Sequence, residues 1–271
     1  MGRQNREHHR PGGRGGAPAP APRGERGERG DWIYGRRPVL EVVKAGKRHL
    51  YEAVLPPGHD APEVAELRGL LLARDVPFRA LEREELDGLC EGGHHQGVAV
   101  RAGGFPYISM DQVLHDVKEN PDALVLLFDH IEDPQNVGSL LRTADAAGVT
   151  AVLIPEDRAA GVTPAAVRAS AGASDHLRVA KVENLVRAMQ ELTEAGVWIT
   201  GLDRVPGAKP YTAVDFKGRA GLVVGSEGRG LSRLVGETCD FIASLPMKGR
   251  VASLNAGVAG AVALYEVVRQ R

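Results

Sequence analysis

From residue 122 to residue 271, short apolar runs alternate with helical patterns, and this alternation constrains the fold more than any other feature. Residues 123–129, ALVLLFD, are apolar up to the final Asp, which is typical of a strand buried on both faces of a sheet. Further runs of this kind lie at 150–155, 177–180, 197–202, 221–225 and 241–246. Strands that alternate with helices predict an α/β domain with a mostly parallel sheet.

Helix-start signals separate several of these runs. Asp133-Pro134 is an N-cap followed by proline at the first helical position, and it predicts a helix through Ala147. Thr163-Pro164 gives the same signal for the start of another helix. Residues 109–120 and 183–196 also carry helical patterns. These segments supply the crossovers that parallel strands require.

A smaller α/β unit precedes this domain. Order is expected to begin near Asp31, and the apolar pattern predicts helices at 37–45, 62–75 and 81–90 and strands at 49–55, 76–81 and 97–102. The segment at 103–106, Gly-Gly-Phe-Pro, is the natural joint between the two units. The predicted organisation is a domain at 31–102, a linker and helix at 103–121, and a larger domain at 122–271.

Residues 1–30 differ in composition from the rest of the chain. They contain seven Arg against three Glu, a local excess of 7 − 3 = +4 in a chain whose formal net charge is −1. Most of the other residues are Gly, Pro and Ala, which cannot bury enough surface to offset the entropy of ordering. We expect a disordered basic arm, which either binds nucleic-acid phosphates or acts as a solubilising leader.

The composition argues against several classes of protein. Cys90 and Cys239 lie far apart without a CxxC partner, so no thiolate metal site is expected. The adjacent His94 and His95 would point to opposite sides of a strand, which argues against a metal site there. No apolar run reaches membrane-spanning length, and the N-terminus lacks the apolar segment of a secretion signal. We therefore expect a cytoplasmic protein with no metal and no membrane segment.

The C-terminal helix carries small residues around nearly its whole girth. Residues 256–263 read AGVAGAVA, which indicates that another element packs very closely against this helix. Ser253 and Asn255 precede it, and polar residues at such a position are either helix caps or ligands.

Ligands of open parallel sheets bind beyond the carboxyl ends of the strands, and three strand-end loops are chemically unusual. The first contains Asn136 and Arg142, and the third contains Ser253 and Asn255. The second, GSEGRG at 225–230, has the glycine order GxxGxG instead of the GxGxxG of dinucleotide sites. Its glutamate also stands where a pyrophosphate would need backbone N–H groups, so we reject a dehydrogenase.

Together the three loops resemble the motifs of the SpoU (TrmH) family of S-adenosylmethionine-dependent RNA 2′-O-methyltransferases. The chain carries N-x-G-x-x-x-R at 136–142, G-S-E-G-x-G at 225–230 and P-M-x-G-x-V-x-S-L-N at 246–255. The resemblance covers about residue 122 to the C-terminus. It implies a trefoil-knotted (SPOUT) parallel-sheet domain, an exception to the rule that folds are unknotted. It further implies S-adenosyl-L-methionine as cofactor, a homodimer, and no metal.

The resemblance also implies site residues. The positions that match the family's catalytic residues are Arg142, Asn136, Glu227, Ser253 and Asn255. The cofactor-binding positions are Gly225, Leu245, Leu254 and Asn255. After this asparagine many relatives carry Val-Ser, whereas this chain has Ala256-Gly257.

Methyl transfer from a sulfonium to a ribose hydroxyl is an in-line displacement, so the enzyme must align three atoms and manage the hydroxyl proton. Because arginine is effectively never deprotonated, we expect Arg142 to bind the target nucleotide and stabilise negative charge on O2′. Asn136 and Glu227 are expected to hold Arg142 and the cofactor loop. Ser253 is expected to bind a phosphate, and Asn255 the cofactor.

The smaller unit, which opens WIYGRRPVLE at Trp32, is similar to an L30e/L7Ae-like RNA-binding domain. In the family this domain precedes the catalytic domain of the branch that methylates a guanosine of 23S rRNA, so 23S rRNA is the expected partner. Methylation of a tRNA ribose or of a different rRNA nucleotide is the alternative. A non-catalytic RNA-binding protein is the remote alternative, and it predicts the loss of a motif residue, which this sequence does not show.

Overall fold

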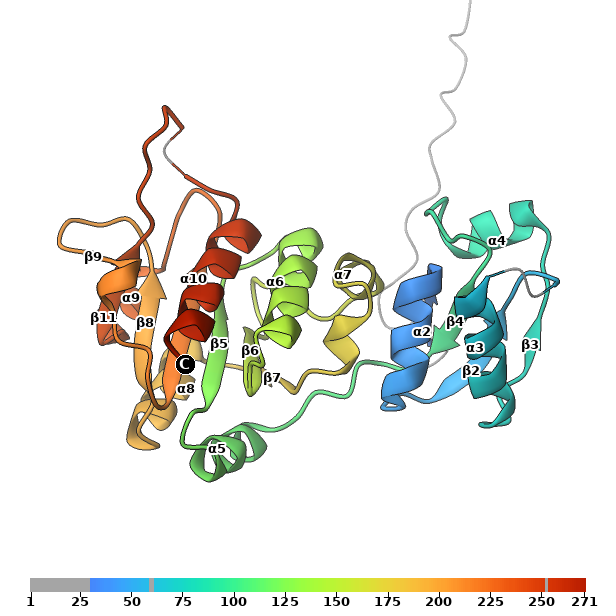
Figure 1. Ribbon diagram of the computed structural model, residues 1–271, viewed down its shortest axis with the longest axis horizontal. Coiled ribbons are helices and arrows are strands. Elements are labelled where there is room, and N and C mark those ends of the chain that lie inside the picture. Colours follow the sequence, from blue (N-terminus) through green and yellow to red (C-terminus); the bar gives the residue numbers. More distant parts are fainter. Residues whose placement is uncertain (1–29, 59–60, 252) are drawn as a thin grey trace, which may run out of the picture.

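The computed structural model describes residues 30–58, 61–251 and 253–271. The arm predicted at 1–30 lies outside this part of the chain except for Gly30. A smaller and a larger α/β unit lie side by side (Figure 1). They are joined by a linker that leads into α5 (Met110–Glu119). Ser109 and Gln112 form a capping box at the start of α5, which fixes where the linker ends.

The smaller unit has one four-stranded sheet in the order β1-β4-β2-β3. Its elements are β1 (Asp31–Tyr34), α2 (Arg36–Ala45), β2 (Leu50–Val54), α3 (Pro62–Leu72), β3 (Phe78–Arg79), α4 (Arg83–Leu89) and β4 (Ala99–Ala102). The predicted helices are present, but β1 was not predicted. This strand has four residues, too few for a readable period, and it is defined by antiparallel pairing with β4.

The larger unit has a seven-stranded sheet in the order β7-β6-β5-β10-β8-β11-β9, and all its strand pairs are parallel. The strands are β5 (Leu124–Asp129), β6 (Ala151–Pro155), β7 (Val179–Val182), β8 (Trp198–Leu202), β9 (Lys209–Pro210), β10 (Ala220–Gly225) and β11 (Phe241–Ser244). The helices are α6 (Pro134–Ala146), α7 (Pro164–Ala169), α8 (Leu185–Glu194), α9 (Arg233–Thr238) and α10 (Ala256–Gln270), with 3₁₀ turns η1 (Ala173–Asp175) and η2 (Tyr211–Ala213). The predicted α/β domain with a parallel sheet is confirmed.

Strands β5 and β10 form the centre of this sheet. Every residue of both strands is buried. Leu126 and Phe128 face the core beneath α6 and α10, whereas Val125 and Leu127 face the core beneath α5 and α8. The two strands pair in register so that Asp129 lies opposite Gly225. Two of the three loops singled out in the sequence therefore begin side by side.

Helix α10 packs closely against one neighbour and leaves its other face open. A Cβ atom built on Gly260 would overlap the end of the Leu140 side chain of α6, so a larger residue here would displace that leucine. The opposite face exposes Val258, Val262, Tyr265 and Val268. The close packing expected from the small residues is thus present on one side of the helix, and the described part of one chain does not cover the apolar stripe on the other side.

The two units contact each other through charged side chains of the smaller one. Arg48 donates from Nε and a terminal nitrogen to the Asp175 carboxylate at 2.6 and 2.9 Å, and both side chains are at most 4% exposed. Lys47 donates to the carbonyls of His176 and Leu177. Burial is the main cause that lowers the pKa of Lys47, and Asp175 partly opposes it.

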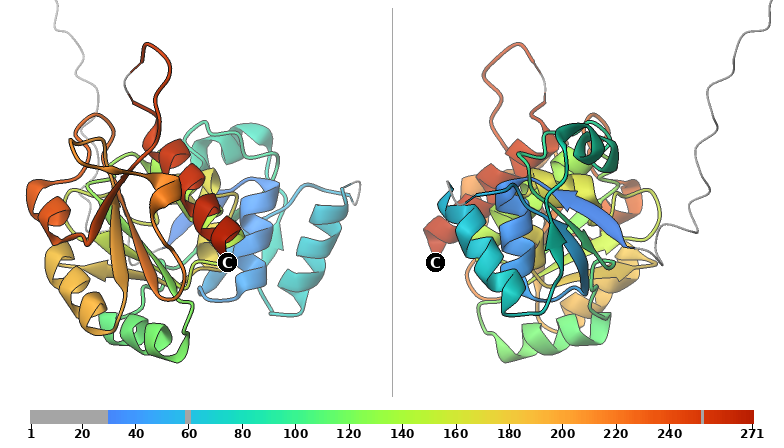
Figure 2. Two further views of the ribbon diagram at one scale, coloured as in Figure 1. Left: turned by 60° about the vertical axis from the view of Figure 1, so that its left-hand side comes forward. Right: turned by 90° about the vertical axis from the view of Figure 1, so that its right-hand side faces the viewer.

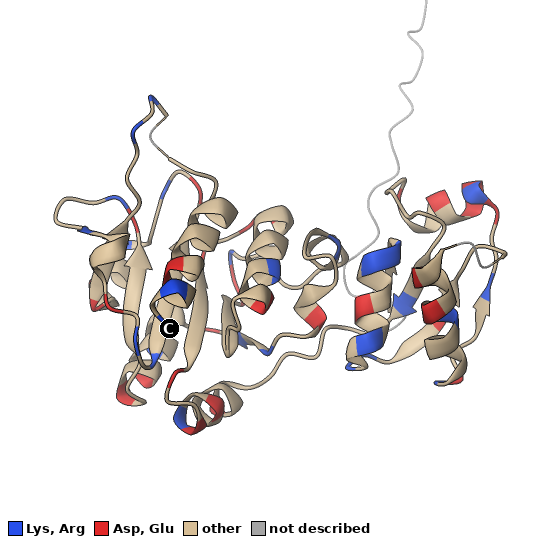
Figure 3. Ribbon diagram, in the orientation of Figure 1, with Lys and Arg blue, Asp and Glu red and all other residues tan. Residues whose placement is uncertain are grey.

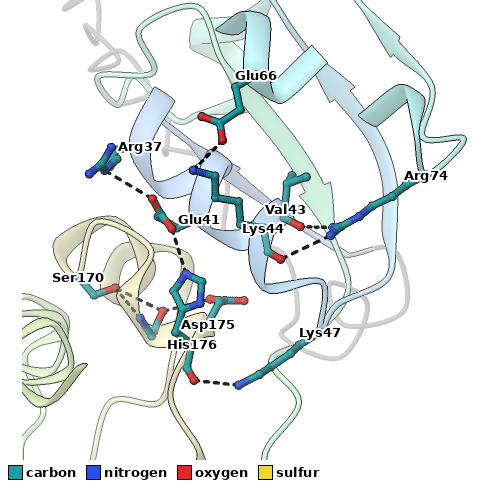
Figure 4. A network of polar contacts seen from close by, with 11 residues as sticks. Arg37, Glu41, Val43, Lys44, Lys47, Glu66, Arg74, Ser170, Asp175 and His176 are labelled. Carbon is teal, nitrogen blue, oxygen red and sulfur yellow. Dashed lines mark hydrogen bonds and ion pairs between the residues drawn. The ribbon is translucent and has the colours of Figure 1, made fainter. Parts of the chain in front are cut away.

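A second part of the contact lies on α2. Glu41 pairs with His176 Nε2 at 3.0 Å (Figure 4). A Cβ atom at Gly172, where φ is +87°, would meet the side chain of Glu41 at 2.6 Å, so the turn fits directly under α2. The smaller unit is therefore held in one orientation by fitted backbone as well as by ion pairs.

We predict that Arg48→Met destabilises the protein by about 3 kcal/mol, because the buried carboxylate of Asp175 loses its cationic partner. Urea unfolding of the full chain measures this change. Arg187→Met is the matched control, since the Arg187–Glu191 pair lies on the surface with its arginine side chain 79% exposed. That control should cost at most about 0.5 kcal/mol. Equal losses in the two variants would contradict the structural role of Arg48.

Candidate active site and cofactor cavity

The three motif loops meet at the carboxyl edge of the sheet. The first follows β5, the second follows β10, and the third runs from β11 to α10. The third loop rises above this edge in both views of Figure 2. The edge is where ligands of open parallel sheets bind, because the loops leave a crevice there.

A hydrogen-bonded cluster of three motif residues ties these loops together. Asn255 donates from Nδ2 to Asn136 Oδ1 at 2.7 Å and to Glu227 Oε2 at 3.3 Å. Its own Oδ1 accepts from the N–H of Val258 at 3.2 Å. Asn255 is therefore the N-cap of α10 and also the link between the first and second loops. The cap expected from the sequence is present, and the same side chain links two motif loops.

A cavity of about 720 Å³ adjoins this cluster. Three of the four predicted cofactor positions, Gly225, Leu245 and Leu254, line it. Ser253 and Glu227 also line it, so the cavity combines an apolar wall with polar groups. Its size is in the range of about 300–1,000 Å³ that is typical of small-molecule and cofactor sites.

Glycines bring the second loop close to the sheet. A Cβ atom at Gly225 would overlap the backbone of Gly230. Gly230 has φ +67°, and a Cβ atom there would lie 2.6 Å from either carboxylate oxygen of Asp203. A larger residue would not fit at either position. The motif therefore has glycines because the loop lies close to its own backbone and to Asp203, and phosphate binding is not needed to explain them.

Two aspartates that the sequence analysis did not select hold this loop in place. Asp203 accepts from the N–H of Leu231 at 3.0 Å, and Asp129 accepts from the N–H of Ser232 at 2.6 Å. Asp129 is 1% exposed. Asp129 ends the apolar strand LVLLFD, and Asp203 directly follows the strand that ends in ITGL. This position in the sequence could have identified both residues, since a carboxylate at a strand end must find hydrogen-bond donors in a neighbouring loop.

Arg142 lies apart from the cluster. Its side chain is exposed on α6 and lines neither the cavity of about 720 Å³ nor a second cavity beside the GSEGRG loop. No hydrogen bond or ion pair joins this side chain to another residue in the described part of the chain. It stands six residues beyond Asn136, about 9 Å along the helix axis. We expected Asn136 and Glu227 to hold Arg142. Within one chain, both side chains instead form hydrogen bonds with Asn255.

The departure at Ala256-Gly257 has a local explanation. A Cβ atom on Gly257 would lie 3.0 Å from Ser139 Oγ and 3.1 Å from Asn255 Oδ1. Glycine lets α10 approach α6 at this point, and the Ser139 hydroxyl occupies the region next to it. The start of α10 therefore keeps a hydroxyl nearby, supplied from α6.

Cysteine thiols and metal ligands are the other groups that could carry chemistry. Burial raises the pKa of Cys239 to about 12 and that of Cys90 to about 11, with nearby aspartates adding to both shifts, so neither thiol is ionised at neutral pH. Among residues 30–58, 61–251 and 253–271, His, Cys, Asp and Glu side chains do not gather in a group of three or more that could hold a metal ion. In the same ranges, the helices are all too short or too polar to cross a membrane.

Comparison with known families agrees with both units. The family described as "SpoU rRNA Methylase family" matches residues 123–265. The family described as "RNA 2'-O ribose methyltransferase substrate binding" matches residues 32–107. The two matches therefore cover the larger and the smaller unit separately.

Individual relatives match along nearly their whole length. A putative TrmH family tRNA/rRNA methyltransferase of Bacillus subtilis is 36% identical over 89% of this chain and 96% of its own. A 23S rRNA (guanosine-2'-O-)-methyltransferase of Xylella fastidiosa is 37% identical over 90% and 98%. The crystal structure of a SpoU methyltransferase from Streptomyces viridochromogenes in complex with AdoMet superposes with a TM-score of 0.73 at 28% identity, covering 88% of this chain and 89% of that chain. The arrangement of the three loops, the family matches and the relatives agree, and the chain belongs to the SpoU family of methyltransferases.

Proposed function

We propose that this protein transfers a methyl group from S-adenosyl-L-methionine to the 2′-hydroxyl of a guanosine in 23S rRNA. Membership of the SpoU family makes it an RNA 2′-O-methyltransferase that uses this cofactor. The observation that carries the proposal is the cluster of Asn255, Asn136 and Glu227 beside a cofactor-sized cavity. The choice of a guanosine in 23S rRNA is supported by relatives of that printed name at 37% and 39% identity.

The assignment of the site follows from these contacts. In our proposal the bent cofactor lies in the cavity lined by Gly225, Leu245 and Leu254. Asn255 holds the two loops that enclose it, and Ser253 faces the same space to bind a phosphate. The smaller unit is proposed to be the L30e/L7Ae-like domain that recognises the rRNA, and the larger unit to be knotted where the third loop threads past the second. Both assignments, and a cytoplasmic location, are inferences from the family.

A homodimer would cover the open face of α10. Val258, Val262, Tyr265 and Val268 lie on one face of the helix and are between 40% and 54% exposed. A continuous apolar stripe of this kind is typical of an interface. A second copy of the chain is the proposed occupant, because twofold symmetry lets the same stripe serve both partners.

The dimer also offers a place for Arg142. This side chain projects from α6, the helix against which α10 packs, and its charge has no partner in the described part of the chain. We infer that Arg142 acts at the cofactor cavity of the other subunit, where it binds the target nucleotide and stabilises the developing charge on O2′. Its guanidinium is too weak an acid to give up a proton, so it is not the base.

The activity is tested by incubating the protein with labelled S-adenosylmethionine and transcripts of 23S rRNA and tRNA. We expect transfer to 23S rRNA, and mass spectrometry of the product should place the methyl group on the ribose of a guanosine. Transfer to tRNA alone would favour the alternative substrate. Absence of transfer to every RNA, together with no cofactor binding by calorimetry, would reject the enzyme.

Arg142→Ala should lower the transfer rate by about 10²- to 10³-fold while cofactor affinity changes only a few-fold. Co-expression with Asn255→Ala tests whether the two residues act across the interface. A mixed dimer of the two variants has one complete site if Arg142 serves the other subunit, and none if it serves its own. Recovered activity is therefore expected, and an inactive mixed dimer would contradict the assignment in trans.

Val262→Asp should convert the protein to a monomer, because a carboxylate at the centre of the stripe would be buried without a partner. Size-exclusion chromatography with light scattering measures this. Leu72→Asp is the matched control, since Leu72 is 63% exposed on α3, away from the stripe. A monomeric wild-type protein at micromolar concentration would show that the stripe has another role.

A further inference from the structure

A second cavity also borders the second motif loop. Its volume is about 560 Å³, and it shares the residues Ser226, Glu227, Arg229, Gly230 and Leu231 with the cofactor cavity. The loop therefore forms part of the wall of both spaces. Asn136, one member of the Asn255 cluster, lines the second cavity. A molecule in the second cavity would thus lie next to the residues that order the cofactor site.

The segment between β6 and α7 presents an arginine to this cavity. The N–H of Glu156 donates to the carbonyl of Val182 at 3.0 Å, and the N–H of Ala160 donates to the carbonyl of Ile131 at 2.9 Å. Between these two anchors the backbone of Arg158 has φ +53°, a left-handed conformation that residues other than glycine rarely adopt. Such strain persists where the surroundings impose it, and it is concentrated at functional sites.

Arg158 has no structural partner to explain this conformation. Its side chain is exposed and lines the cavity, and no hydrogen bond or ion pair joins it to any residue of the described ranges. Glu132 lines the same cavity, yet the two do not form an ion pair. The backbone of Arg158 is anchored on both sides, and its guanidinium is available to a ligand.

The chemistry of the site indicates the ligand. Methyl transfer needs a second reactant beside the cofactor, and a ribose within RNA brings a phosphate and a base with it. A guanidinium matches the geometry of a phosphate through two parallel hydrogen bonds. Lys248 and Arg250 are exposed in the loop before α10, and Figure 3 shows basic positions on that loop. These basic side chains attract a polyanion, whereas Glu132, Asp133 and Glu227 of the second cavity leave room for few phosphates there.

We propose that the second cavity receives the target nucleotide and that Arg158 binds the phosphate next to the ribose to be methylated. This inference rests on the proposed function and adds a binding site for the RNA to it. The second motif loop then borders both reactants, with Asn136 lining the nucleotide site and Gly225 lining the cofactor site, and the ribose meets the methyl group where the two cavities adjoin. Arg158 positions the substrate and takes no part in breaking or forming a bond.

Three substitutions of Arg158 separate this role from a structural one. Arg158→Ala should raise KM for RNA about tenfold, with kcat and cofactor affinity changed less than threefold. Arg158→Lys should recover part of the loss, because the charge remains but the planar fork is absent. Arg158→Gly should bind RNA as poorly as the alanine variant, yet its Tm should equal or exceed that of the wild type, because glycine adopts φ +53° without strain.

Salt dependence gives a readout that loss of structure would not produce. Loss of one phosphate contact should reduce the slope of log K against log salt for RNA binding by about one. Arg187→Ala on α8 is the control with the same charge change, since Arg187 lines neither cavity. Glu132→Gln should leave RNA affinity unchanged or raise it, because it removes a negative charge that repels a phosphate in the cavity.

The outcomes distinguish this inference from the proposed function. Wild-type methyl transfer combined with unchanged KM and unchanged salt slope in Arg158→Ala and Arg158→Gly would overturn the role of Arg158 and leave the enzyme in place. Failure of the wild type to transfer methyl groups would reject the proposed activity, and the salt dependence of RNA binding would still decide whether Arg158 contacts a phosphate. A lower Tm in Arg158→Gly together with weaker binding would show a structural role instead.

Discussion

The side chain of Asn255 makes hydrogen bonds to three segments that are far apart in the sequence: the start of α6, the loop after β10 and the first turn of α10. An asparagine amide has one acceptor and two donors, and here each is used by a different segment. The position and direction of α10 therefore depend on the same residue that orders the second motif loop. Because α10 in turn packs against α6 at Gly257 and Gly260, a change at Asn255 would disturb the cofactor cavity and the packing of the helix together. This coupling explains why one side chain can be both a helix cap and a member of the site.

The loop after β10 borders two cavities, and its rigidity has an identifiable origin. Asp129 and Asp203, at the ends of neighbouring strands, accept hydrogen bonds from its backbone, and Gly225 and Gly230 let it lie directly against the sheet. A fixed loop keeps the shape of both cavities constant when a ligand binds in either of them. Preorganised geometry of this kind lowers the entropic cost of aligning the reacting atoms. A metal would add little to this reaction, since a sulfonium already supplies an activated methyl group.

The smaller unit is held on the larger one by a buried ion pair, Arg48–Asp175, and by the close fit of Gly172 under α2. A buried pair contributes little to stability when compared with apolar residues, but it is specific in geometry, because any other docking would leave two charges buried and unpaired. RNA held on the smaller unit would therefore meet the strand-end loops of the larger unit in one orientation. The unpaired Arg158 lies on the segment that precedes α7, and α7 contacts the smaller unit through β1.

The sequence by itself determined the α/β class, most of the helices and the three motif loops, because periodicity, caps and glycine spacing act over a few residues. It also identified Asn136, Glu227 and Asn255, which the structure brings together, and Gly225, Leu245 and Leu254, which line one cavity. It did not reveal β1, which is defined by pairing with a strand some 70 residues away, or the roles of Asp129, Asp203 and Arg158. Nor did it show that Arg142 stands apart from the cluster within one chain, since helical spacing gives the face of a residue but not what lies opposite that face. Hydrogen bonds between distant segments and the shape of the cavities depend on how the strands are ordered in the sheet, and that order was decided only by the tertiary packing.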